Sequence, residues 1–478
     1  MSQLLSASLA LALLTPLATS AATAPEPASE IKLLRQEIEA LRAAHEARLQ
    51  TLERRLLAAE QAAGAGARAP GATAAAATAA TATTAVPLPA SATEPTATKA
   101  PSAGANAFNP AISLILSGGF TRTSLDPERY AISGFHLPSG TEAGPGTRGF
   151  SLAESELGLS ASIDPWLRGA VAIALHPDDA VSVEEAYFET TALGRGLSLK
   201  AGRFLSGVGY VNAQHAHNWD FVDNPLAYQA MLGTQYADDG VQLRWLAPTD
   251  QYFELSAELG RGRSYPGSDS SRNGAGMRAL GAHTGGDVGD NHSWRAGLSV
   301  LTAKASEQEL SSIDAAGGPL DPLFSGNTRV WLLDGVWKWA PGGNATRTNF
   351  KLQAEYLRST REGSLSVDVD GVAMTDRYRG VQSGWYLQGV YQFMPSWRLG
   401  LRAERLNPGT PDFGLNAAGF AASAYQPRKN TVMLDYSPSE FSRIRLQFAK
   451  DRSREGAPDK QLFLQYQMSL GAHGGHAY

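Results

Sequence analysis

The sequence predicts an all-β transmembrane barrel of about 16 antiparallel strands, preceded by a short α-helical coiled coil and a disordered linker. Three observations support this prediction. Apolar and polar residues alternate along most of the chain after residue 107, which is the period of a strand with two different faces. Short turns alternate with long polar loops, as in bacterial outer-membrane barrels. Beyond the N-terminus, no segment approaches the roughly 20 apolar residues of a membrane helix.

The composition excludes several other classes of protein. Of 478 residues only 18% are charged, the formal net charge is −5, and there is no cysteine. The lack of cysteine excludes a disulfide scaffold, a thiol nucleophile and a lipoprotein anchor. The negative charge argues against a nucleic-acid partner. The sequence has no G-x-S-x-G, H-E-x-x-H or Walker motif, so we expect that the protein is not an enzyme.

Residues 1–24 have the pattern of a secretory signal peptide. An apolar run at 4–14 is followed by Pro16 and by small residues that end in the A-x-A pattern Ala22-Thr23-Ala24. No Lys or Arg precedes the run, which departs from the usual pattern. The alternative is a buried N-terminal helix.

The pattern of apolar residues along 25–61 predicts a periplasmic coiled coil. Apolar residues recur at steps of mostly three and four, at Ile31, Leu34, Ile38, Leu41, Leu49, Leu52 and Leu56. An isolated helix of this length is marginal in water, so the stripe is expected to join protomers. Packing of the helix against its own barrel is the alternative.

Residues 62–106 are almost entirely Ala, Thr, Gly, Pro and Ser, and they contain no aromatic residue. Such a segment cannot bury a core, so we expect an Ala/Thr/Pro-rich linker.

Residues 107–478 predict the outer-membrane β-barrel. From Gln461 to Leu470, apolar and mostly polar residues occupy strictly alternate positions. The same pattern predicts sixteen strands near 111–123, 150–163, 166–175, 182–191, 196–204, 239–247, 251–260, 275–286, 292–304, 328–340, 346–358, 382–394, 396–406, 430–437, 441–450 and 460–470. A soluble β-sandwich array or propeller is the alternative, but no blade repeat is present.

The connections between these strands fall into two classes. Short ones contain Pro, Gly or Asp, as at 163–166 and 394–397. The longer polar ones are 125–149, 262–274, 305–327, 359–380 and 407–428. The longest connection, 205–238, is rich in aromatic and small residues, unlike a solvated surface loop. It is similar in position to the loop of general porins that folds inward, and this resemblance implies that it narrows the lumen. Alternation is expected to point ten charged side chains into the lumen: Lys200, Arg203, Arg244, Glu254, Glu258, Glu355, Arg398, Arg402, Glu404 and Arg445. Opposed charges of this kind tune which ions pass, and their mixture predicts no clear preference for anions or cations.

The same loop contains a candidate metal site at His215, His217, Asp220 and Asp223. Neutral imidazole and carboxylate suit zinc, copper or nickel. The alternative is that these histidines only hydrogen-bond to the barrel wall. No other cofactor is expected.

Several segments resemble proteobacterial outer-membrane porins with a periplasmic coiled coil ahead of the barrel, distantly similar to phosphate-selective porins O and P. They are Phe108-Asn109-Pro110-Ala111-Ile112-Ser113, Glu185-Ala186-Tyr187, Lys200-Ala201-Gly202-Arg203-Phe204, Trp337-Lys338-Trp339-Ala340-Pro341, Asn344-Ala345-Thr346 and Met468-Ser469-Leu470-Gly471-Ala472-His473-Gly474. The resemblance implies a trimeric or monomeric channel linked to metal supply. Relatives are often labelled zinc-regulated TonB-dependent receptors, but a plugged receptor needs about 22 strands and a plug domain. The arginine ladder of phosphate porins is not evident.

The leading hypothesis is therefore an outer-membrane porin through which small hydrophilic solutes or ions diffuse. A metal (zinc) uptake component is the first alternative, and an envelope tether or structural barrel is the second. The expected surroundings are outer-membrane lipid and lipopolysaccharide, and the expected assembly is a homo-oligomer, with the trimer implied by the resemblance.

Overall fold

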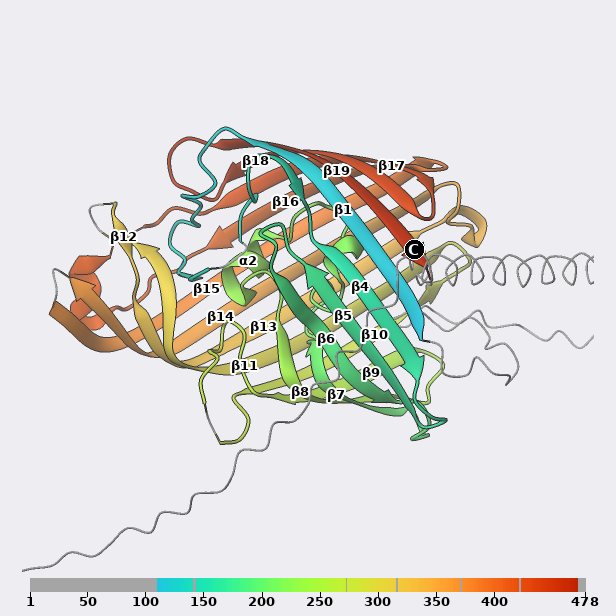
Figure 1. Cartoon of the computed structure of the whole chain (residues 1–478), viewed down its shortest axis with the longest axis horizontal. Helices are drawn as coiled ribbons and strands as arrows, with labels where there is room; N and C mark the ends of the chain where they lie inside the picture. Colours follow the sequence, from blue (N-terminus) through green and yellow to red (C-terminus); the bar gives the residue numbers. More distant parts are fainter. Residues whose placement is uncertain are drawn as a thin grey trace, which may run out of the picture. The chain divides into compact units, whose positions relative to one another are not determined.

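The computed structural model describes residues 110–140, 143–271, 273–314, 317–369, 372–420 and 423–471. The predicted signal peptide (1–24), coiled coil (25–61) and linker (62–106) lie outside these residues. The described chain is a single antiparallel sheet that closes into a barrel (Figure 1).

Sixteen long strands follow one another around the barrel, as the alternation predicts. They are β1 (Ala111–Thr123), β4 (Ser155–Ser162), β5 (Leu167–Leu175), β6 (Val181–Thr190), β7 (Leu197–Leu205), β8 (Ala237–Leu246), β9 (Tyr252–Gly260), β10 (Met277–Val288), β11 (His292–Ile313), β13 (Leu323–Trp339), β14 (Asn349–Val369), β15 (Val372–Met394), β16 (Trp397–Asn407), β17 (Arg428–Ser439), β18 (Ser442–Arg452) and β19 (Asp459–Gly471). Three short pieces are added to them: β2 (Leu137–Pro138), β3 (Gly149–Leu152) and β12 (Pro319–Leu320).

The barrel closes between its first and last strands. β1 pairs antiparallel with β19, from Ser113 opposite Gly471 to Thr123 opposite Gln461. On its other side β1 pairs with β3 and β4. Because every long strand has a neighbour on both sides, the sheet has no open edge whose backbone groups would lack partners in lipid.

The two faces of the sheet differ as the alternation predicts. On β16, Leu399 and Leu401 are 41% and 60% exposed on the outside, whereas Arg402 and Glu404 between the outward positions are each 3% exposed. Large apolar side chains are exposed in the same way around the other strands. An outward apolar surface of this extent is stable only in lipid, so the barrel is of the transmembrane type.

Four strands extend far into segments that were expected to be long loops. β11, β13, β14 and β15 run through most of 305–327 and 359–380, which were expected to be loops. The prediction was wrong here because short stretches of alternation continue in these polar segments. Leu365 and Val367 alternate with serine and pack with Phe324 and Tyr378 in a second buried cluster.

At the end of the barrel opposite the long connections, short turns join the strands. In the turn after β4, Asp164 Oδ1 accepts hydrogen bonds from the backbone amides of Trp166 and Leu167 at 2.7 and 2.8 Å. After β15, Ser396 takes a positive φ of 69° that reverses the chain within two residues. These local bonds explain why such short connections suffice.

Helices are few among the described residues: α2 (Leu226–Leu232), η1 (Ala216–Asn218), η2 (Pro341–Gly343) and η3 (Gly414–Gly419). None of them is long and apolar enough to cross a bilayer. Pro225 precedes α2 and Gly233 ends it in the left-handed conformation with φ of 65°. Every residue of α2 is buried, because the helix packs with Ile132, Leu301, Leu332 and other inward apolar side chains.

Candidate functional site in the barrel lumen

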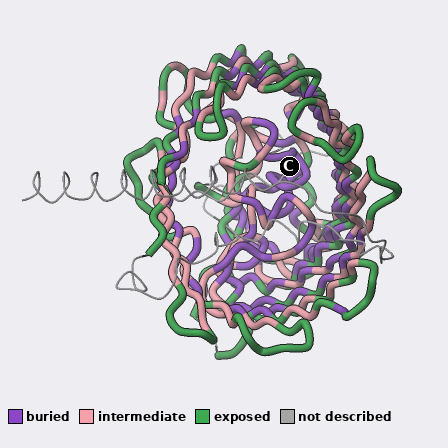
Figure 2. Tube along the Cα trace, turned by 90° about the vertical axis from the view of Figure 1, so that its right-hand side faces the viewer, coloured by how far each residue is buried: buried purple, intermediate pink, exposed green. Residues whose placement is uncertain are grey.

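The segment between β7 and β8 lies inside the ring of strands. Figure 2, turned by 90° from Figure 1, shows buried chain within the ring. Residues of η1 and α2 belong to this segment, as do the buried Val208, Val211 and Phe221. Most of its side chains are apolar or small, and it follows the wall of the barrel instead of projecting into solvent. We call residues 205–238 the lumen loop.

Inward glutamates on β9, β14 and β16 bind the backbone of the lumen loop. Glu355 on β14 accepts hydrogen bonds from the amides of Tyr210 and Val211 at 3.0 and 3.1 Å and from the Tyr228 hydroxyl at 2.7 Å. Glu404 on β16 accepts from the amide of Leu226 at 2.6 Å. Glu258 on β9 accepts from the amide of Gly207 at 2.8 Å and from the Ser206 hydroxyl at 2.6 Å. These carboxylates satisfy amides that the loop does not pair internally.

Basic side chains on β14, β16 and β17 bind the two aspartates of the loop. Asp220 pairs with Lys351 and, at 3.3 Å, with Arg398. Asp223 pairs with Arg402 at 2.9 Å and with Lys429 at 2.6 Å. Burial alone raises the pKa of both aspartates, but the adjacent cations outweigh burial and hold each pKa well below its ordinary value. Both groups are therefore carboxylates at neutral pH.

The cations continue on the same side of the lumen. Asp435 on β17 lies 2.7 Å from Arg398 and 3.5 Å from Arg445. Arg445 also donates to the carbonyl of Trp219 at 2.8 Å, and Arg443 donates to the carbonyl of His217 at 2.7 Å. The loop is thus bound by its backbone as well as by its aspartates to the basic side of the barrel.

On the other side of the lumen, the inward charged side chains of β4, β6 and β9 are carboxylates, among them Glu156, Glu189 and Glu258. Glu189 on β6 pairs with the predicted Arg244 of β8. Lys200, also predicted, lies over the ring of Tyr187 at 4.1 Å from its centroid. Glu254 pairs in register with the buried His283 and so shares its inward face. Nine of the ten predicted lumen charges therefore lie on inward positions, and the tenth does not.

Arg203 points away from the lumen, which corrects its predicted position. It lies three residues from the inward Lys200, and an odd separation along a strand places two side chains on opposite faces. Its partner in register is Asp239 on β8, two residues from the outward Val241. Arg203 Nε donates to Asp239 Oδ1 at 2.7 Å. The pair therefore lies on the outer surface near the long-loop end.

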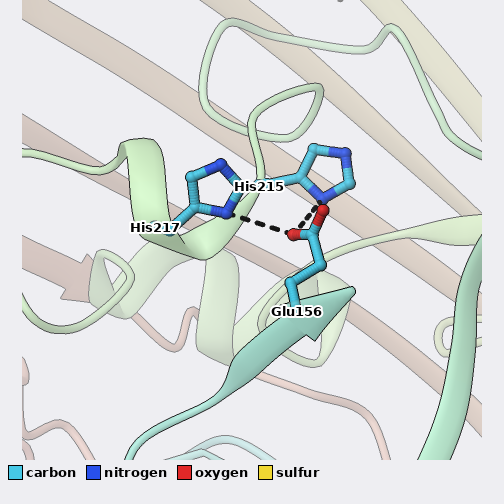
Figure 3. Close-up of side chains that lie close together, drawn as sticks. All are labelled: Glu156, His215 and His217. Atoms are coloured by element: carbon cyan, nitrogen blue, oxygen red, sulfur yellow. Dashed lines mark ion pairs between the residues drawn. The ribbon is translucent and has the colours of Figure 1, made fainter. Parts of the chain in front are cut away.

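Histidines of the lumen loop converge on a carboxylate of the barrel wall. Figure 3 shows His215 and His217 on either side of Glu156 of β4. Both Nδ1 atoms lie 3.1 Å from Glu156 Oε2, and the two rings stack with centroids 5.5 Å apart. Glu156 Oε2 is fully buried. The ligand atoms of the three residues lie within 4.8 Å of one another, which is compact enough for one metal ion.

Two further carboxylates complete this cluster. Glu184 Oε2 lies 3.1 Å from His215 Nδ1, and Glu185 Oε2 lies 3.0 Å from His215 Nε2. Consecutive residues on one strand normally face opposite ways, but β6 bulges here: Ala172 pairs with Glu185 and Ile173 with Val183, so Glu184 is left over. Burial alone lowers the pKa of His215, but Glu184 and Glu156 outweigh burial and hold that pKa well above its ordinary value.

The structure separates the predicted metal ligands into two groups. His215 and His217 share a cluster, whereas Asp220 and Asp223 are bound by Lys351, Arg398, Arg402 and Lys429. Glu156 was not predicted as a site residue, although alternation along 150–163 places it on the polar face. The inward position of Glu184 has no sequence signal, because a bulge cannot be read from periodicity.

Comparisons with known proteins give one relative and several distant structures. No family model matches the chain. A protein of Aquifex aeolicus (strain VF5), described as "Uncharacterized protein", is 30% identical over 400 residues, which are 78% of this chain and 80% of the relative. The two chains belong to one family.

Solved barrels that cover 76% of this chain include an anion-selective porin from Comamonas acidovorans, 10% identical with a TM-score of 0.46 over 99% of that chain. The outer membrane channel DcaP of Acinetobacter baumannii is 12% identical with a TM-score of 0.44 over 97% of its chain.

Proposed function

We propose that this protein is an outer-membrane porin through which small hydrophilic solutes or ions diffuse. The proposal rests on one observation: a closed barrel of sixteen strands has an apolar outer face and an inner face of opposed charges. A barrel of this size encloses an aqueous channel. The known barrels that it resembles include proteins described as porins and channels.

Planar-bilayer recording tests this proposal directly. Purified full-length protein should give stepwise conductance increments, and a salt gradient should give a reversal potential that reports ion selectivity. The opposed charges predict only weak selectivity. Reconstituted, folded protein that gives no conductance steps would rule out a porin.

We further propose that the lumen loop narrows the passage. Its attachments on β9, β14 and β16 support this, because they lie on widely separated strands. Replacing Asp220 and Asp223 by Asn should release the basic side of the loop and raise single-channel conductance or its fluctuation. Asp250→Asn, in an exposed turn, is the matched control. Identical conductance in all three proteins would contradict the narrowing.

Two further proposals concern assembly. A homo-oligomer, with the trimer favoured by the resemblance, is tested by the mass of the protein in native detergent complexes.

An envelope tether is tested by deleting residues 25–105: a variant that conducts normally but no longer links outer membrane to cell wall would support tethering.

Metal uptake is the second candidate function, supported by the cluster of Glu156, His215 and His217. Imidazole and carboxylate donors within 4.8 Å of one another suit zinc, nickel or copper. Glu184 and Glu185 add negative charge around the same point. A divalent ion would replace the imidazole protons as the partner of these carboxylates.

Titration calorimetry with zinc on the full-length protein tests this site. His215→Ala/His217→Ala and Glu156→Gln should each remove a high-affinity binding event. His176→Ala, whose ring lies against Ser182 at an exposed position, is the matched control. Equal zinc affinity in wild type and the histidine variant would exclude the cluster as a metal site and leave its ion pairs as the explanation.

A further inference from the structure

Five basic side chains form a patch on the outer surface of the barrel. Arg405 of β16, Arg428 of β17, Lys450 and Arg452 of β18 and Lys460 of β19 occupy outward positions on adjacent strands, close to the end of the barrel at which the long loops lie. Four of them are exposed and Arg452 is half-buried. We call these residues the basic patch.

The register of the strands places like charges directly opposite one another. Arg405 pairs with Arg428, and Arg428 pairs in turn with Arg452. Two residues away along β18, Lys450 pairs with Lys460 of β19. Like charges at directly opposed positions of an antiparallel sheet destabilise it. Three such contacts in one patch imply a compensating anion.

The described residues supply no carboxylate to this patch. Arg405 donates to the side chain of Gln426, a neutral group. The neighbouring β15 shows the ordinary arrangement, because Arg377 pairs with Asp412 at 3.1 Å and Arg379 with Glu362 at 3.1 Å. The basic patch thus differs from the exposed arginines of the neighbouring β15 in having no internal counter-charge among the described ion pairs.

The position of the patch indicates where the anion comes from. On the same outward faces lie the exposed Leu401, Val432, Phe448 and Leu464, which belong to the apolar surface of the barrel. Along its strand, each basic residue lies two or four positions from one of these apolar residues, on the side of the long-loop end. The patch therefore lies at the border of the apolar surface, where the headgroups of a bilayer would be.

We propose that the basic patch binds the phosphate groups of lipopolysaccharide. This step rests on the proposed outer-membrane location, since the long-loop end of such barrels faces outside and its leaflet contains this phosphorylated glycolipid. Guanidinium groups bind phosphate through two parallel hydrogen bonds. A phosphate between Arg428 and Arg452 converts their repulsion into charge-assisted contacts.

Lipopolysaccharide affinity of the detergent-solubilised full-length protein tests the proposal, with EDTA present so that divalent cations do not bridge phosphates. The test variant is Arg405→Gln/Arg428→Gln/Arg452→Gln. The control is Arg278→Gln/Arg377→Gln/Arg379→Gln, which removes the same charge from exposed positions outside the patch. We expect roughly hundredfold weaker binding in the test variant and a change below about threefold in the control.

Thermal unfolding without lipid gives an independent readout. Without lipid, the test variant should unfold at the same temperature as the wild type or at a higher one, because its like-charge contacts are gone. Added lipopolysaccharide should raise the unfolding temperature of the test variant far less than that of the wild type. Equal lipopolysaccharide affinity of the two triple variants would overturn the proposal. The proposal would also be overturned if the wild type bound dephosphorylated lipopolysaccharide, phosphatidylglycerol or inorganic phosphate as tightly as it binds intact lipopolysaccharide. Bilayer conductance of the test variant should match that of the wild type. If neither protein conducts, the proposed porin function is contradicted but the proposed lipopolysaccharide binding is not.

Discussion

The hydroxyl of Tyr228 donates a hydrogen bond to Glu355 Oε2 across 2.7 Å, and so joins the helix of the lumen loop to strand β14. The same carboxylate accepts hydrogen bonds from Tyr386 and from two loop amides. Four donors on one buried group make Glu355 the most connected attachment of the loop among those described above. Loss of this attachment should therefore lower the stability of the barrel and alter the current through the channel.

Glu355→Gln tests this attachment. The amide places a donor where four donors already point, so at least one hydrogen bond is lost and a buried polar group is left unsatisfied. We expect a loss of about 1–3 kcal/mol in the free energy of unfolding, together with larger current fluctuations. Denaturant unfolding and single-channel recording measure the two effects. Glu254→Gln, an inward glutamate without a described contact to the loop, should change neither, and equal effects of the two variants would contradict the assignment.

Gly209→Ala tests the same contact from the side of the loop. A Cβ at this position would lie 2.4 Å from the Tyr228 hydroxyl and 2.5 Å from Glu355 Oε2, so the bond between them must break. Gly274→Ala is a matched control, because Gly274 also has a positive φ, 91° against 69°, but has open space around it. Both variants carry backbone strain of about 1 kcal/mol. Thermal unfolding should show a clearly larger loss for Gly209→Ala, and equal losses would mean that strain alone matters.

Acid should loosen the basic side of the loop. Asp220 and Asp223 have pKa values held below the ordinary value near 4 by their cationic partners. A lowered carboxyl pKa stabilises the folded state above the unfolded value, and this stability is lost as pH falls below about 4. Conductance fluctuation should therefore rise between about pH 4 and 2. The conductance of Asp220→Asn/Asp223→Asn should already fluctuate at pH 7 and should not depend on pH in this range. If this variant responds to acid as the wild type does, other titrating groups cause the response.

A different group should respond at milder pH. His136, in the connection after β1, packs edge-on against Phe413 and Phe420, and its Nδ1 lies 2.9 Å from the Ser312 hydroxyl. Burial, with Arg361 nearby, lowers its pKa to about 3. A lowered histidine pKa stabilises the folded state above the ordinary value near 6.5, and this contribution declines as pH falls from about 6.5 toward 3.

Hydrogen exchange of residues 130–137 measures this effect. Protection, corrected for intrinsic exchange rates, should fall between pH 7 and pH 5. The fall should disappear in His136→Phe, which cannot be protonated. A fall of the same size in that variant would show that another group causes the loosening.

Alternation along the chain predicted more of the fold than of the site. It places Leu399, Leu401 and Leu464 outside and Glu355, Arg402 and Arg445 inside, because the side-chain period of a strand is a local property of the backbone. The wrong expectation for 359–380 came from reading polar composition as a loop, although Leu365 and Val367 retain the period. Arg203 was misplaced because its separation from Lys200 is odd.

By itself the sequence determined the number of strands, the face on which most of their side chains lie and the identity of the long connection between β7 and β8. Tertiary structure decided which charges meet. Closure of the barrel brings Glu156 to His215 and His217, a bulge adds Glu184, and strand register opposes Arg428 to Arg452. These pairings depend on register and closure between segments distant in sequence, whereas periodicity along one strand records only which way each side chain points.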